Sequence, residues 1–277
     1  SRPKERSNIM TFFAFREERL EREGQQEVLE KIKLGKGIWN LEELPEELHA
    51  LLTRTILDQA NDEWWGGAQY FECVRLAPTS EERQYMRELG RQEQGHAHIL
   101  ARGSLAALGV DFFAQLAASA KEQKPILEIF THPEEFISWA DVVAFNVVQD
   151  GGADIQLQRF KQGPFGKWSV DIERLEAEET GHREHGERWV KKLSSTNRGK
   201  YLLQLAFQKW LPRALRAFGA PDATSKSLPL YKKYNLKDSN DVQRHELIVS
   251  IRPLLDMCGY VSPILLNPEL AWSSEFL

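Results

Sequence analysis

The sequence is poor in cysteine and has no long apolar run. Cys73 and Cys258 are the only cysteines among 277 residues, which argues against a disulfide framework and favours a reducing compartment. No apolar segment reaches the roughly 18 residues that a membrane-spanning helix requires. Residues 1–8 are polar and do not form the apolar core of a signal peptide. We therefore expect a cytoplasmic protein that has no membrane contact.

An excess of positive charge is also missing. The formal net charge is −5, so electrostatics do not favour binding to nucleic acid or to anionic lipid. Strand signals are scarce, because alternating β-branched runs between tight turns do not occur. Long segments with helical spacing of apolar residues dominate instead. Together these features predict an all-α protein with a single domain, residues 1–277.

The helical segments are separated by clear turn residues. Thr79 and Ser80 precede the acidic pair Glu81 and Glu82, as at a helix start, and Gly109 fits a helix end. Residues 163–166 interrupt the pattern again, and the segment from Pro263 onward is expected to be an extended tail. The predicted helices are 14–33, 45–76, 80–108, 111–121, 133–162, 167–193, 199–218 and 241–257.

Four of these helices are long and form two consecutive pairs. The pairs are joined by a long connection, residues 109–132. This outline predicts a ferritin-like four-helix bundle with a crossover, together with extra N- and C-terminal helices. The expected divisions are a core over about 45–195, an N-terminal arm over 1–44 and a C-terminal extension over 196–277.

Two segments have the pattern Glu-x-x-His. They contribute Glu93 with His96 and Glu179 with His182. Positions i and i+3 lie on one face of a helix, so each pair can direct a carboxylate and an imidazole to one point. A single copy in a chain rich in glutamate would be a weak signal, because it could equally lie on a solvated face.

The spacing of two further acids strengthens this signal. Glu63 lies 30 residues before Glu93, and Asp150 lies 29 residues before Glu179. In antiparallel helix pairs, residues at such a separation meet at the same height. Four carboxylates and two imidazoles are the ligand set of di-iron and di-manganese bundles, and these ligand types suit iron or manganese. The predicted ligands are Glu63, Glu93, His96, Asp150, Glu179 and His182.

Several neighbouring residues are alternatives or additions to this set. Asp154 lies one turn beyond Asp150 and could replace it. His185 lies one turn beyond His182 and could lie near the site, but it is interpreted chiefly as a surface residue. His98 lies off the face of His96 and is expected either to support the ligands from behind or to lie at the surface. Tyr70 and Asn146 could line the cavity, although ordinary packing would explain both.

The proposed ligands stand beside small and aromatic residues. Gly66–Gly67 and Gly151–Gly152 predict either close helix approach and room for a substrate, or simple helix breaks. Five aromatic residues could form a substrate pocket, or could belong to the core. They are Trp64, Trp65, Trp139, Phe145 and Trp189.

These motifs together resemble the phenylacetate-catabolism di-iron family over about residues 45–270. The resemblance rests on ligand spacing and on the segments around the ligands. The matching segments are Asp62–Glu63, Ala77–Thr79, Gln92–His96, Ser138–Val142, Gln149–Ala153, Glu178–Gly186, Trp210–Pro212 and Phe218–Gly219. Residues 88–91 depart from it, because they are less basic than expected near a coenzyme A phosphate.

The resemblance implies a fold, an activity and partners. Members of the family are ferritin-like bundles with a non-haem di-iron centre, and they insert one atom of dioxygen into the ring of an aryl-CoA thioester as an epoxide. Electrons come from a separate reductase, and the catalytic subunit pairs with a homologous non-catalytic one. The complete ligand set implies that this chain is of the catalytic type.

The sequence therefore predicts a di-iron monooxygenase that hydroxylates or epoxidises an aromatic or acyl-CoA substrate, as a homodimer or with a homologous subunit. The main alternative is a ferroxidase or peroxide-reducing protein without an organic substrate. Two further alternatives are a radical-generating subunit that uses Tyr70 and a partner subunit with a degenerate site.

Overall fold

The computed structural model describes residues 24–34, 37–119, 133–273 and 276. These residues fold into helices, and one isolated parallel β-bridge joins Ile38 to Phe165. The predicted all-α, ferritin-like fold is confirmed. None of the described helices combines the length and the apolarity needed to cross a bilayer.

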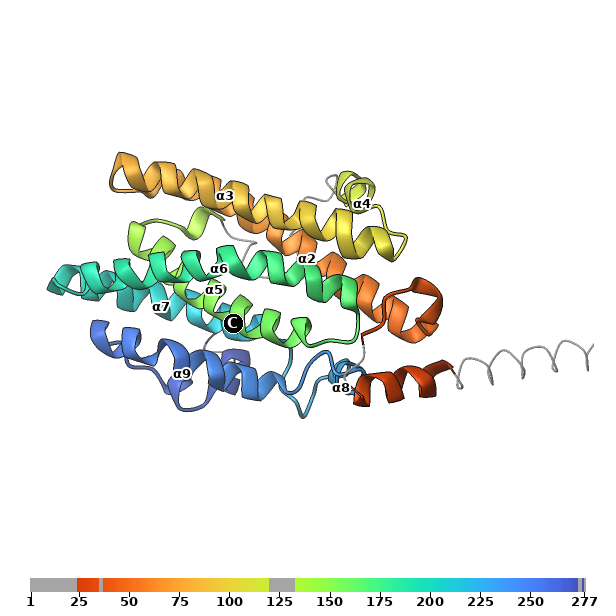
Figure 1. Ribbon diagram of the computed structural model, residues 1–277. Coiled ribbons are helices and arrows are strands. Elements are labelled where there is room, and N and C mark those ends of the chain that lie inside the picture. Colours follow the sequence, from red (N-terminus) through yellow and green to blue (C-terminus); the bar gives the residue numbers. More distant parts are fainter. Residues whose placement is uncertain (1–23, 35–36, 120–132, 274–275, 277) are drawn as a thin grey trace, which may run out of the picture.

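Four long helices form the bundle (Figure 1). They are α2 (Glu46–Cys73), α3 (Ser80–Leu100), α5 (Trp139–Lys161) and α6 (Gly166–Leu193). Two further long helices, α7 (Asn197–Ala217) and α9 (Asn240–Cys258), follow, and α4 (Phe112–Ser119) and α8 (Leu228–Lys233) are short. Residues 24–33 are also helical. The predicted helix over 14–33 is thus described only in its second half, and the predicted end of the helix over 111–121 lies outside the described residues.

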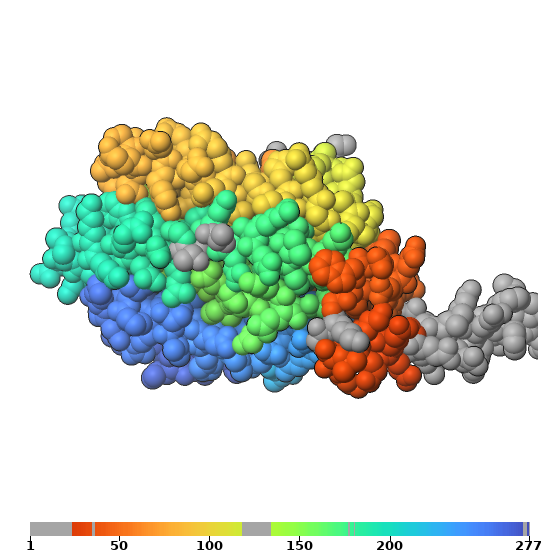
Figure 2. Space-filling model, in the orientation of Figure 1, coloured from red at the N-terminus to blue at the C-terminus, as the bar shows by residue number. Residues whose placement is uncertain are grey.

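The helices pack in three layers. α2 pairs with α3, α5 pairs with α6, and α7 and α9 cover α5 from the side opposite to α3 (Figure 1). The face shown in Figure 2 consists largely of side chains from α3, α6 and α9. The first part of α5 is enclosed, since every residue from Trp139 to Val148 is buried, whereas its last two turns are partly exposed. A helix that is covered on all sides needs apolar residues all round.

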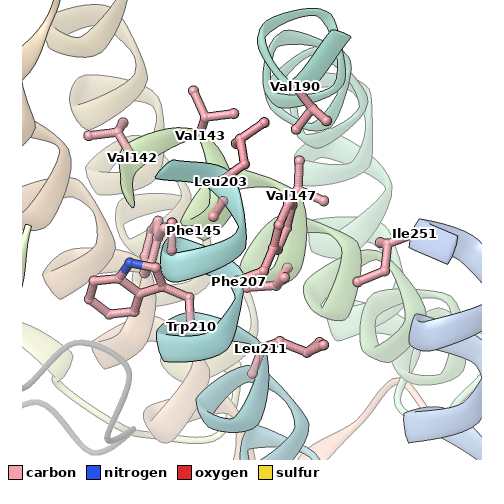
Figure 3. Close-up of a cluster of buried hydrophobic side chains, with 14 of the residues drawn as sticks. Val142, Val143, Phe145, Val147, Val190, Leu203, Phe207, Trp210, Leu211 and Ile251 are labelled. Carbon is pink, nitrogen blue, oxygen red and sulfur yellow. The ribbon is translucent and has the colours of Figure 1, made fainter. Parts of the chain in front are cut away.

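The core between α5 and its covering helices is dense in large side chains (Figure 3). Phe145 and Val147 of α5 meet Phe207 and Trp210 of α7 there. Ile251 of α9 belongs to the same cluster. Burial of such side chains contributes roughly 1.5–3 kcal/mol each, so this contact fixes the position of α5.

The third long helix begins six residues later than the sequence predicted. Pro133–Glu135 forms a short 3-10 helix, and α5 begins at Trp139. The reason is a capping box, in which Ser138 accepts from the backbone N–H of Asp141 and the Asp141 carboxylate accepts from the backbone N–H of Ser138. Asp141 also pairs with Lys209 of α7, at 2.6 Å, so the helix start is tied to the covering layer.

A wide turn interrupts the end of the second helix. Residues Ala101–Leu105 form a π-helix between α3 and the predicted stop at Gly109. The carboxylate of Asp171 on α6 accepts from the backbone N–H of Ser104 at 2.6 Å and also from its hydroxyl. A Cβ on Gly103 would lie 2.1 Å from Asp171 Oδ2, so the glycine makes room for this contact.

The C-terminal segment is not extended, contrary to the prediction. Pro263–Leu265 and Pro268–Trp272 are short 3-10 helices, and Ile264 and Ala271 are buried. Arg216 of α7 donates to the carbonyl oxygens of Ala271 and Phe276, each at 2.8 Å. These contacts hold the segment against α7. The sequence prediction also missed α8.

Candidate metal centre

The four bundle helices each bring one carboxylate to the middle of the molecule. Glu63 comes from α2, Glu93 from α3, Asp150 from α5 and Glu179 from α6. The helices continue through the glycine pairs, so the interpretation of these glycines as helix breaks is wrong. A Cβ on Gly67 would lie 2.6 Å from the carbonyl oxygen of Gly90, which shows how closely α2 and α3 approach.

Four of the six predicted ligands form one tight group. Glu63, Glu93, His96 and Glu179 each offer an atom within 4.8 Å of the others. His96 Nδ1 lies 3.3 Å from Glu63 Oε2 and 3.2 Å from Glu179 Oε1. Three carboxylates and one imidazole nitrogen therefore point to a common centre.

The other two predicted ligands extend this group on the side of Glu93 and Glu179. His182 Nδ1 lies 3.1 Å from Glu93 Oε1 and 3.5 Å from Glu179 Oε2. Among the described residues, this buried nitrogen has no hydrogen-bond partner, as expected for a ligand atom that faces a metal ion. Asp150 lines the same cavity as Glu93 and Glu179. Glu93 and Glu179 thus lie between the two imidazoles.

The second nitrogen of each imidazole has a partner in the opposite half of the bundle. His96 Nε2 lies 3.2 Å from Glu178 Oε2, and His182 Nε2 lies 3.0 Å from Gln92 Oε1. Such partners orient the ring of a metal-binding histidine and select its tautomer. The sequence prediction missed both residues. The sequence feature that could have identified them is their position, directly before the glutamate of each Glu-x-x-His segment.

Asp150 is held by two polar neighbours. Tyr70 Oη donates to Asp150 Oδ1 at 3.2 Å, and Asn146 Nδ2 donates to Asp150 Oδ2 at 3.1 Å. Asn146 Nδ2 also donates to Tyr70 Oη at 3.2 Å. The alternative acid, Asp154, pairs with Arg183 at 3.5 Å. Asp150 is therefore the acid of α5 that faces the group.

The acids and imidazoles strongly perturb one another. Burial, with repulsion from Glu179, raises the pKa of Glu93 well above its ordinary value. Burial also raises the pKa of Asp150 to about 8. Burial alone would lower the pKa of His96, but contacts with Glu179 and Glu63 outweigh it and raise that pKa to about 12. The imidazoles thus act as the cations of the cluster, a role that metal ions could take by displacing their protons.

His185 differs from its main interpretation as a surface residue, whereas the interpretation of His98 left both a supporting and a surface position open. His185 is buried, its Nε2 lies 2.7 Å from Glu82 Oε2, and its ring stacks on Tyr85 with 4.1 Å between centroids. His98 is half-buried and packs on Phe113 and Trp64. His185 therefore joins α6 to α3, and His98 packs on aromatic side chains of α2 and α4.

A cavity of about 220 Å³ adjoins the carboxylates. It runs between α2 and α5 and is closed by Ala214 and Ala217 of α7 and by Tyr231 of α8. Of the five aromatic residues considered from the sequence, Phe145 lines it. Trp139 and Trp189 instead pack edge to face on each other in the core.

The sequence profile of a family described as phenylacetic acid catabolic protein matches residues 35–267. The chain belongs to this family. The predicted resemblance is thereby confirmed, and membership gives the chain a role in phenylacetate catabolism, as a component of an enzyme system. No curated protein sequence matches the chain significantly.

Proposed function

We propose that the chain is the catalytic subunit of a non-haem di-iron monooxygenase that hydroxylates or epoxidises an aromatic substrate, with an aryl-CoA thioester among the candidates. Two iron ions would be held by Glu63, Glu93, His96, Asp150, Glu179 and His182. The observation that carries the proposal is the placement of two imidazole Nδ1 atoms on either side of Glu93 and Glu179, beside a cavity.

The donor set fits two divalent ions. Glu63 and His96 would serve one ion, Asp150 and His182 the other, and Glu93 and Glu179 both. Four carboxylates offset the charge of two divalent ions, and buried acids this close together are unfavourable without cations. When bound, the irons would supply the activation of dioxygen, with electrons from an external reductase.

The surrounding residues have distinct tasks in this proposal. Tyr70 and Asn146 fix the carboxylate of Asp150, and Gln92 and Glu178 fix the two imidazole rings. Phe145, Leu157 and Phe160 give the cavity apolar walls that exclude water. An engineered apolar cavity of about 150 Å³ admits benzene, so a cavity of about 220 Å³ has room for one aromatic ring and a short side group. The bulk of a coenzyme A carrier would lie outside it.

The test combines metal analysis with turnover. The protein is loaded anaerobically with Fe(II), its iron content is measured, and dioxygen uptake is followed with a chemical reductant and phenylacetyl-CoA or phenylacetate. We expect substrate-dependent uptake and a product that carries one atom of labelled oxygen. A fully loaded protein that oxidises none of these substrates would contradict the proposal. His182→Ala serves as the control that should lose iron.

The same assay separates the alternatives. Rapid oxidation of Fe(II) without any organic substrate would support a ferroxidase, although the apolar cavity walls have no use in that reaction. A tyrosyl radical signal in electron paramagnetic resonance would support a radical-generating subunit, an alternative that is favoured by the contact between Tyr70 and Asp150. A homologous subunit and a reductase as partners are part of the oxygenase proposal and can be tested by co-purification.

A further inference from the structure

Lys237 lies in the wall of the cavity that contains the carboxylates. It follows α8, and it shares this wall with Gln156 of α5 and Ala217 of α7. Among the described residues that line the cavity, Lys237 is the only one with a basic side chain. The metal-binding proposal leaves this residue without a role.

The ammonium group of Lys237 is only partly satisfied by the protein. Its Nζ donates to the carbonyl oxygen of Phe218, at the C-terminal end of α7, which is a favourable place for a cation. An ammonium group has three N–H donors, and no described carboxylate lies within ion-pair distance of this one. Two donors therefore remain for a ligand in the cavity.

Burial lowers the pKa of Lys237 to about 8, and the positive charge of Arg244 adds to this effect, while Asp222 opposes it. A partly desolvated cation without a direct ion-pair partner is unfavourable. An acceptor oxygen from a bound molecule would remove part of that cost.

The geometry of α5 sets the length of such a molecule. Gln156 Nε2 donates to the carbonyl oxygen of Ala217 at 3.4 Å, and Ala217 directly precedes the residue that accepts from Lys237. At 1.5 Å per residue, Gln156 lies about 9 Å along α5 from Asp150. Leu157 and Phe160 add apolar surface on the same wall. One aromatic ring with a short acyl arm spans this distance.

We propose that Lys237 binds the acyl oxygen of the substrate and thereby directs its aromatic ring toward Glu63, Glu93, Asp150 and Glu179. The inference rests on the proposed function, because it assumes an organic substrate. The shared chemistry is an acyl oxygen next to an arylmethyl group, from either a free arylacetate or an arylacetyl thioester.

The cavity wall also contains two acids of α2, Asp58 and Asp62. Asp58 lies 3.8 Å from the guanidinium of Arg54.

The experiment measures binding without turnover. Mn(II)-loaded protein is titrated anaerobically with phenylacetate, phenylacetyl-CoA and ethylbenzene, which lacks the acyl oxygen. We expect Lys237→Met to lower the affinity for at least one of the two acyl ligands by about tenfold or more. The affinity for ethylbenzene should fall by less than about twofold. Lys237→Arg should restore part of the affinity, because it keeps a charged donor. The exposed Lys226 provides the matched control, and Lys226→Met should bind all three ligands as the unmodified protein does.

Each outcome decides the proposal. A loss confined to phenylacetate identifies the free acid as the ligand, and a loss confined to phenylacetyl-CoA identifies the thioester. Unchanged affinity for both in Lys237→Met, or an equal loss for ethylbenzene, would overturn it. Thermal melting of Lys237→Met and Lys237→Arg verifies that both are folded. Dioxygen uptake by Fe(II)-loaded samples of the same variants tests the oxygenase separately, since ligand binding to the Mn(II)-loaded protein does not require iron chemistry.

The pH dependence gives an independent readout. Besides Arg244 and Asp222, the hydroxyl of Tyr231 is a titratable group of the cavity wall, and it lies 2.9 Å from Thr55 Oγ1. Because the pKa of Lys237 is about 8, the ammonium form is complete below that pH and is lost above it. Affinity for the acyl ligand should fall above pH 8 in the unmodified protein. The same loss in Lys237→Met would overturn the assignment to Lys237.

Discussion

The two halves of the bundle carry the same ligand pattern in different surroundings. In the first half, Glu63 is 12% exposed, and Gln59 Nε2 lies at a long 3.4 Å from its Oε1. In the second half, Asp150 is enclosed and accepts hydrogen bonds from Tyr70 and Asn146. Asp150 thus has two hydrogen-bond donors, Tyr70 of α2 and Asn146 of α5, whereas Glu63 has a long contact with Gln59 and a contact with the Nδ1 atom of His96. We therefore expect Asp150 to be the more firmly held of the two acids.

The difference in residue type follows the same division. An aspartate is shorter than a glutamate and has fewer side-chain torsions, so it suits a position on a helix that is packed on every side. Glutamate is suited to the more open side, where its carboxylate can change position. We expect any shift of carboxylates during turnover to occur at Glu63.

The largest effect should come from Glu179, which contacts the imidazoles of both halves. We expect Glu179→Gln to lose both iron ions, and Glu63→Gln to retain about one of the two ions per chain. Iron content by mass spectrometry checks this, with the exposed Glu184→Gln as control. Two firmly bound ions in Glu179→Gln would contradict the assignment of this residue to both ions.

The next effect tests the support of each acid. Tyr70→Phe removes the hydroxyl that donates to Asp150, and we expect metal affinity to fall about 10–100-fold. Gln59→Leu removes the weak contact with Glu63 and also the acceptor of the Trp168 indole N–H, so it should lower stability but change metal affinity by less than about threefold. Competition with a chelator measures both affinities. Equal losses in the two variants would show that the halves do not differ in rigidity.

The glycines beside the two acids should also respond differently. A Cβ on Gly67 would collide with Gly90 O at 2.6 Å, whereas a Cβ on Gly152 would meet Phe218 at an ordinary 3.6 Å. We expect Gly67→Ala to lower the free energy of unfolding by roughly 1–3 kcal/mol. Gly152→Ala should leave it unchanged or raise it by up to about 1 kcal/mol. Urea denaturation measures the free energy of unfolding of both variants. A Gly67→Ala protein as stable as the unmodified one would refute the expected difference between the two glycines.

The smallest effect concerns the glycine inside each Glu-x-x-His segment, where the halves should agree. Within the part of the chain that the structure describes, an added Cβ on Gly95 or Gly181 would have no atom within 4 Å outside the backbone of its own helix and its two neighbours in sequence. Alanine at either position should raise the free energy of unfolding by roughly 0.5–1 kcal/mol, because glycine is unfavourable within a helix. Iron content should stay unchanged. A destabilising effect in only one half would reveal a contact with another molecule there.

Local rules explain what could be predicted. The helices from Glu46 and Ser80 begin where proline and threonine signals placed them, and both Glu-x-x-His pairs lie on buried faces because i and i+3 share a face. The start of α5 was misjudged, since Pro133 outweighed the capping pattern of Ser138 and Asp141. The burial of His185 was missed because its partner, Glu82, lies on α3 rather than on its own helix.

The sequence by itself determined the order of the long helices, the all-α fold and the residues that approach one another at mid-bundle, because helical periodicity and turn residues act over a few positions. Only the tertiary structure decided that Tyr70 and Asn146 donate hydrogen bonds to Asp150. The same holds for the contact of Asp171 with the π-helix at the end of the second helix, and for the position of Lys237 in the cavity wall. These features join side chains from different helices, so they depend on how the helices pack and have no counterpart in the local pattern.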